Sequence, residues 1–137
     1  MQAKIPIVPE TLLYRRHGQG KYWIRAEGLP SPAAFKLRVE KNERALSVDI
    51  AELTTPRETA LEPVSGKEWA ASELLAKIPL AQELDCEHTP NSKNPAHASI
   101  FHPKVINGEE SPEYFNDNYS SWLAFASRIV YPEYLKK

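Results

Sequence analysis

The chain has 137 residues, of which 42% are hydrophobic and 26% charged, and its formal net charge is −1. This composition is ordinary for a globular domain, and a domain of this length buries roughly two-thirds of its unfolded surface without a metal or a disulfide. The single cysteine excludes an internal disulfide framework. No apolar run approaches the ~18 residues of a membrane span, and no leader-like apolar stretch opens the chain. We therefore expect one cytoplasmic domain over 1–137 that does not use a membrane.

The small net charge conceals an uneven distribution. Residues 1–44 contain nine Lys/Arg and four Asp/Glu, a balance of +5, whereas residues 45–137 contain eight and fourteen, a balance of −6. Such asymmetry indicates either a basic docking face or two sets of charges that balance each other on folding.

The first third of the chain predicts short extended elements. Residues 10–16 fit a short helix or a strand equally well, and residues 17–21 form a loop. Residues 22–25 predict a short strand, and the Gly/Pro cluster over 28–32 predicts a turn.

The strongest structural pattern lies between Phe35 and Leu53. Apolar residues alternate with charged ones over 35–40, and with polar ones over 46–50, after a polar break at 41–44. Two runs of period two joined by a short polar loop predict a β-hairpin. In this hairpin Val48 faces the core and Lys36 faces solvent.

The second half of the chain predicts two helices and two strands. Thr55 and Pro56 are typical of a brief helical turn, and Ser65 with Glu68 has the spacing of a capping box before a helix over 65–78. Strands follow at 80–88 and 96–101. Ser111 and Pro112 then predict the start of a helix over 112–131.

These elements together favour the α+β class. We expect a small, mainly antiparallel sheet with a central hairpin at about 35–53, covered by two helices at about 65–78 and 112–131. The alternative is a small, partly open β-barrel with flanking helices.

A basic and aromatic segment over 14–25 is the main candidate for function. It contains cations, aromatic residues and glycines but no acid, a combination that suits phosphates and stacked bases. The residues that we expect to bind an anion are Arg15, Arg16, His17, Lys21, Trp23 and Arg25. Residues 18–20 lack the other positions of a P-loop or a dinucleotide fingerprint.

Two further clusters have weaker signals. Cys86, His88, His97 and His102 are chemically able to hold zinc, but their spacing matches no zinc pattern, so we expect no metal. Arg38, Ser47 and Asp49 lie on the polar face of the predicted hairpin and, with His97, contain the residue types of a Ser-His-Asp site. No nucleophile-elbow motif surrounds Ser47.

The sequence leaves three functional hypotheses open. The first is a binding or accessory protein, without a cofactor, that engages nucleic acid, a nucleotide or an acidic protein surface through the basic segment. The second is an enzyme acting on a nucleotide or phosphoester, with His17 or His97 as acid–base group. The third is an interaction subunit that contacts another protein through aromatic residues of the C-terminal helix.

Overall fold

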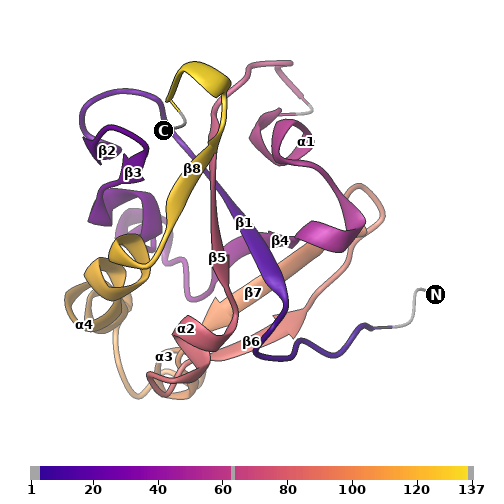
Figure 1. The fold of residues 1–137 in the computed structure, drawn as a ribbon. Helices are drawn as coiled ribbons and strands as arrows, with labels where there is room; N and C mark the ends of the chain where they lie inside the picture. The colour runs from indigo at the N-terminus through magenta and orange to yellow at the C-terminus, as the bar shows by residue number, and fades with distance from the viewer. Residues whose placement is uncertain (1–3, 63, 136–137) are drawn as a thin grey trace.

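A six-stranded antiparallel sheet organises the protein in the computed structural model, which describes residues 4–62 and 64–135 (Figure 1). Its strands are β1 (Leu12–His17), β4 (Leu46–Ile50), β5 (Ala70–Leu75), β6 (Asp85–His88), β7 (His97–Phe101) and β8 (Arg128–Tyr131). They lie in the order β6-β7-β4-β1-β5-β8, and a separate two-stranded sheet pairs β2 (Ile24–Ala26) with β3 (Leu29–Pro30). The predicted α+β class with a mainly antiparallel sheet is confirmed. The sheet does not close into a barrel.

Short helices and turns connect the strands. The α-helices are α1 (Pro56–Ala60), α2 (Lys77–Leu80), α3 (Pro103–Ile106) and α4 (Pro112–Phe125). The 3-10 turns are η1 (Pro32–Phe35), η2 (Val39–Lys41), η3 (Ala51–Leu53) and η4 (Glu133–Leu135). No helix of the described residues is long and apolar enough to cross a membrane.

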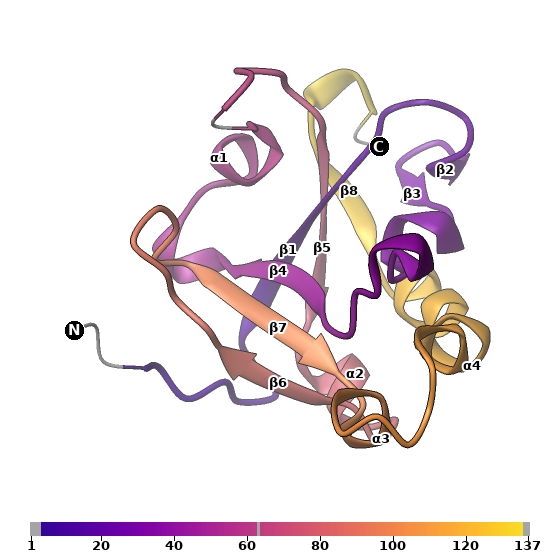
Figure 2. The ribbon, with the colours of Figure 1, turned by 180° about the vertical axis from the view of Figure 1, so that it is seen from behind.

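The two faces of the large sheet have different surroundings. On the core face, Leu13 lies opposite Ile50 and Leu74, and all three side chains are buried. This face packs against Phe35 of η1 and Phe115 of α4. The other side, which we call the outer face, contacts α1, so α1 and α4 lie on opposite sides of the sheet (Figures 1 and 2).

Two predicted helix starts are confirmed. Thr55 caps α1 by accepting the Glu58 backbone N–H at 3.2 Å, and Pro56 occupies the first helical position. Helix α4 begins at Pro112 after Ser111. It ends at Phe125 rather than 131, because residues 128–131 instead form β8, where Ile129 is buried beside β5.

The predicted hairpin over 35–53 is wrong in its first arm. Strand β4 forms, with Val48 buried as expected, but it pairs with β1 and β7. Residues 35–41 instead lie in η1, η2 and the link between them. Their backbone groups find partners on α4: Asn116 binds both the N–H and the C=O of Leu37, at 2.7 and 3.0 Å, and Ser120 donates to Phe35 O at 2.8 Å. This segment therefore needs no strand partner.

The predicted helix over 65–78 is also wrong. Residues 70–75 form β5, which pairs with β1 along six positions and with β8 on its other side. Gly66, with φ of 72°, lies in the turn that precedes β5. A strand with a partner on each edge is largely buried, so its sequence is a nearly continuous apolar run. Such a run also contains the spacing of an apolar helical stripe, which is why the sequence predicts a helix here.

Candidate functional site

The basic segment is divided between the two faces of the large sheet. Successive residues of a strand point to opposite faces, so Arg15 and His17 lie on the core face and Arg16 on the outer face. Arg15 donates from Nε to Ala34 O at 2.8 Å and from Nη1 to Ser47 O at 2.9 Å. Burial lowers the pKa of Arg15 to about 10. Its guanidinium is thus engaged in joining β1 to η1 and β4, while Arg16 donates to Leu61 O at 3.3 Å.

His17 is an interior residue with only 4% of its surface exposed. Its Nδ1 lies 2.8 Å from Gly18 O and its Nε2 lies 2.7 Å from Ser72 Oγ. A carbonyl oxygen only accepts, so Nδ1 carries the proton and Nε2 accepts from Ser72. Burial, opposed by the bond to Gly18, lowers the pKa of His17 to about 4. The imidazole is therefore neutral at pH 7.

Trp23 is half-buried and packs against the hydrophobic core. Its indole lies directly on Gly18, where an added Cβ would be 2.1 Å from Trp23 Nε1. Tyr22 meets the Trp23 ring edge-on, with centroids 5.0 Å apart, yet 69% of Tyr22 is exposed. Tyr22, rather than Trp23, is therefore the ring of this pair that is accessible to a ligand.

Arg25 connects the basic segment to helix α4. Its Cζ lies 4.5 Å from the centroid of Phe125, which is 61% exposed, and its Nε donates to Pro30 O at 3.1 Å. Lys21 is exposed. We call Lys21, Tyr22, Arg25 and Phe125 the cation–aromatic surface. Other aromatic residues of α4, such as Phe115 and Tyr119, lie in the core, whereas Trp122 is partly exposed.

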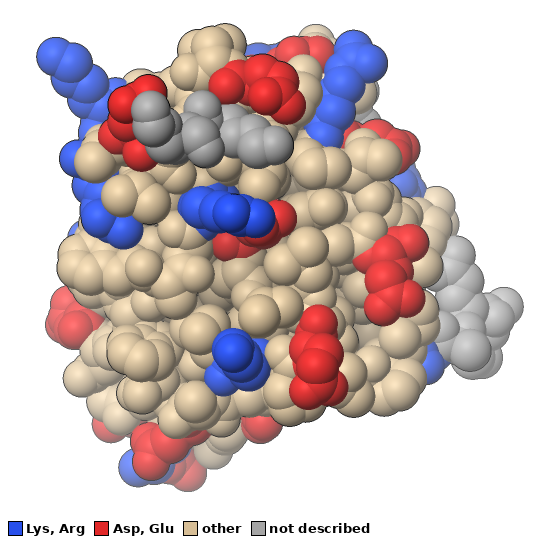
Figure 3. All heavy atoms as spheres, in the orientation of Figure 1, with Lys and Arg blue, Asp and Glu red and all other residues tan. Residues whose placement is uncertain are grey.

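The charged side chains are unevenly spread over the surface. Figure 3 shows, on the face it draws, Lys and Arg gathered along the upper left margin, over the part where Figure 1 draws β2 and β3, and both signs interspersed on the rest of that face. Ion pairs among the described residues include Lys4–Glu87, Arg38–Glu43, Arg57–Glu68 and Arg128–Glu73. Of these four, Lys4–Glu87 joins the basic first third of the chain to the acidic remainder.

A row of ionisable side chains crosses the outer face. Strand register places His97 opposite Asp49, Asp49 opposite Tyr14, Tyr14 opposite Glu73, and Glu73 opposite Arg128. We call these five residues the ionisable row. Burial and the nearby Glu73 raise the pKa of Tyr14. Sequence reasoning missed Glu73 and Arg128 because both lay in segments predicted as helices.

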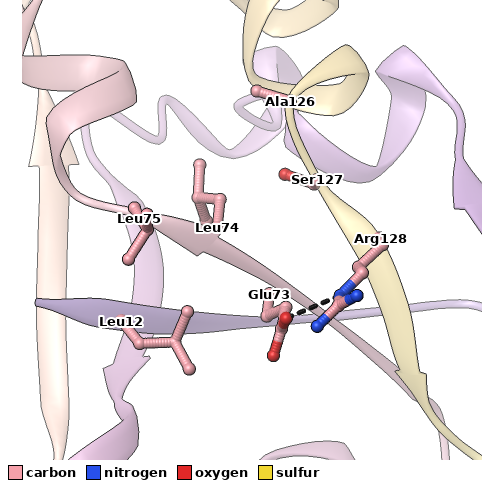
Figure 4. Close-up of a pocket in the computed structure, with 7 residues that line it drawn as sticks. All are labelled: Leu12, Glu73, Leu74, Leu75, Ala126, Ser127 and Arg128. Carbon is pink, nitrogen blue, oxygen red and sulfur yellow. Dashed lines mark hydrogen bonds and ion pairs between the residues drawn. The ribbon is translucent and has the colours of Figure 1, made fainter. Parts of the chain in front are cut away.

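One end of the ionisable row borders a hollow of about 350 Å³ (Figure 4). The hollow is lined by Leu12, Glu73, Leu74, Leu75, Ala126, Ser127 and Arg128. Arg128 Nε binds Glu73 Oε2 at 2.7 Å, so the two charges of the hollow already pair with each other.

The other end of the ionisable row brings Ser47 and His97 together. His97 Nε2 lies 3.1 Å from Ser47 Oγ, and His97 Nδ1 lies 3.0 Å from Thr89 O and 2.8 Å from Thr89 Oγ1. Asp49 does not orient the histidine. Its two carboxylate oxygens accept instead from Thr59 Oγ1 at 2.8 Å and from Asn94 Nδ2 at 2.9 Å. Arg38 is engaged elsewhere, in an ion pair with Glu43.

The histidines weighed as zinc ligands have other hydrogen-bond partners, and Cys86 packs against the hydrophobic core. His88 Nδ1 accepts the Ile5 N–H at 2.8 Å while its Nε2 donates to Pro95 O at 2.7 Å. His102 Nδ1 accepts the Lys104 N–H, and burial raises the pKa of Cys86 to about 12. No group of three or more His, Cys, Asp or Glu side chains within 4–62 and 64–135 is placed to hold a metal.

No family model, curated protein or solved structure matches this chain.

Proposed function

We propose that this protein is a binding or accessory protein that engages single-stranded nucleic acid through the cation–aromatic surface. The observation that carries the proposal is the contact of Arg25 with the exposed ring of Phe125, together with an accessible Tyr22 three residues before Arg25 along the chain. This arrangement presents a cation and two exposed aromatic rings on nearby stretches of the chain, the groups that bind phosphates and stack on bases.

The chemistry of the surface suits a phosphate backbone with accessible bases. Lys21 and Arg25 supply positive charge for phosphates, and the rings of Tyr22 and Phe125 offer flat apolar faces for stacking. The net charge of −1 provides no general attraction to nucleic acid, so binding depends on this local surface. The proposed surface leaves out Arg15, whose guanidinium is engaged by Ala34 O and Ser47 O, and His17, which is buried.

A fluorescence-anisotropy titration with a labelled oligothymidine tests the proposal. Parent protein should bind at ~50 mM salt and lose affinity steeply as salt rises, because each phosphate contact releases counterions. Replacing Lys21 and Arg25 by Gln should weaken binding and flatten the salt dependence. Tyr22→Ala should weaken binding about 5-fold or more, since stacking contributes ~1–3 kcal/mol per base.

The matched control replaces Lys41 and Lys93, two exposed lysines outside the surface, by Gln. This variant should bind like the parent. Absence of binding by the parent at ~50 mM salt, where electrostatic attraction is strong, would disprove the nucleic-acid proposal. Equal binding of a polyglutamate peptide and the oligonucleotide would instead indicate an acidic protein partner.

The exposed part of helix α4 supports a second candidate, a protein–protein contact. Trp122 is 44% and Phe125 61% exposed on the same helix, and aromatic residues are enriched in interfaces. If α4 mediates self-association, light scattering should show an oligomer that Phe125→Ser converts to a monomer.

A further inference from the structure

We propose that Ser47 and His97 form a nucleophile–base pair on the outer face that transfers the acyl group of a carboxylic ester to water. This activity is separate from anion binding, because Ser47 and His97 lie on β4 and β7, outside the cation–aromatic surface.

The proposal requires the proton of His97 to reside on Nδ1. Two oxygens of Thr89 are placed to accept it there: the carbonyl oxygen at 3.0 Å, which only accepts, and the hydroxyl oxygen at 2.8 Å, which can accept or donate. Nε2 then has a free electron pair that faces Ser47 Oγ at 3.1 Å. With the proton placed this way the Ser47 hydroxyl donates to the histidine, the arrangement that activates a serine.

The surrounding strands hold the pair in position. Register places Ser47 opposite Ser99 and Asp49 opposite His97, so Ser47 and His97 are diagonal neighbours on one face. Thr89 is the positioning residue, and its hydroxyl also contacts Ser99 Oγ at 3.1 Å. A backbone carbonyl thus occupies the place that a carboxylate takes in a Ser-His-Asp triad.

The proposed reaction has two balanced steps. Ser47 Oγ forms a bond to the ester carbonyl carbon while its proton passes to His97 Nε2. The bond to the leaving oxygen then breaks, and that oxygen takes the proton from Nε2, leaving an acyl-Ser47 ester. Water repeats the sequence in the second step, giving up a proton to Nε2 and releasing the carboxylic acid and the free serine.

The open surroundings define the substrate class. Ser47 is exposed on the outer face, so the negative charge that develops on the carbonyl oxygen is solvated by water. The pair therefore suits esters with a good leaving group, such as aryl esters, rather than amides, whose leaving nitrogen needs more assistance.

A fluorophosphonate probe, which forms a stable bond to activated serines, tests the proposal. The parent should gain one adduct, and peptide mapping by mass spectrometry should place it on Ser47. Ser47→Ala should abolish the adduct. His97→Gln should slow its formation about 100-fold, because a general base contributes ~10²–10⁴ in rate. Parent protein should also hydrolyse p-nitrophenyl acetate, and Ser47→Ala should not exceed the buffer rate.

One control variant separates the catalytic roles from structural ones. Ser99→Ala removes a neighbouring hydroxyl from the same face but leaves both Ser47 and His97 in place. Its rate of labelling should stay within about twofold of the parent rate, whereas loss of a general base should lower it by ~10²–10⁴. An adduct on a serine other than Ser47 in the parent, or equal labelling of His97→Gln and parent, would overturn the proposal. Mapping the adduct on the parent protein needs no variant. It therefore tests whether Ser47 is the nucleophile even if a variant unfolds.

Discussion

At the scale of single residues, Gly18 shows how closely the Trp23 indole packs on the backbone. A Cβ built at Gly18 lies 2.1 Å from Trp23 Nε1, whereas one built at Gly20 has nothing within 4 Å. Gly18→Ala should therefore displace the indole and destabilise the protein by about 1–3 kcal/mol, the usual cost of overpacking. Gly20→Ala, two residues on, is the matched control and should melt like the parent. Equal melting of both variants by circular dichroism would contradict this packing.

His17 should make the stability depend on pH. Its pKa of about 4 in the folded protein lies below the ordinary histidine value of 6.5, so between these values the unfolded chain binds a proton that the folded chain does not. Stability is therefore fully present above about pH 6.5 and is lost as the pH falls towards 4, by about 3 kcal/mol in all.

The His17→Gln variant isolates this contribution, since both proteins share every other titrating group. We expect urea denaturation between pH 7.5 and pH 4 to show a larger loss of unfolding free energy in the parent than in the variant. Parallel pH profiles would show that His17 is not the responsible group.

At the scale of elements, Asn116 links helix α4 to the segment that was predicted as the first hairpin arm. Its amide both accepts from Leu37 N and donates to Leu37 O. Asn116→Ala would leave a half-buried N–H and C=O without these partners, so we expect a loss of about 1–3 kcal/mol. Asn118→Ala removes an exposed side chain that bonds only within α4, to Tyr114 O, and should cost clearly less. Chemical denaturation of the two variants compares them directly, and similar losses would argue against the bridging role.

At the scale of the whole molecule, the fold should not depend on a metal. The Cys86 thiol has its pKa raised to about 12 by burial, and zinc requires the thiolate. Both nitrogens of His88 are engaged by the backbone. Purified protein should contain no stoichiometric zinc, and EDTA should leave the melting temperature within about 1 °C, because chelators unfold only metal-dependent domains. Zinc at one equivalent, lost in Cys86→Ala, would refute this expectation.

The sequence alone determined the features that depend on neighbouring residues. Thr55 caps a helix that begins at Pro56, and α4 begins at Pro112 after Ser111, because a side-chain cap and the fixed φ of proline both act within one turn. The alternation that buries Val48 and exposes Ser47 also follows from the local period of a strand. The α+β class followed from such local patterns taken together.

Only the tertiary structure decided which partner hydrogen-bonds to the backbone of each segment. Residues 36–38 alternate as a strand does, yet Asn116, some eighty positions away, supplies the hydrogen bonds that a neighbouring strand would give. Residues 70–75 follow a helical stripe, yet pairing on both edges with β1 and β8 makes them a strand. The same long-range pairing places His97 beside Ser47, turns Arg15 and His17 inward, and brings Phe125 to Arg25. These arrangements depend on contacts between residues that are distant in sequence. The energies of such contacts cannot be inferred from a local sequence pattern.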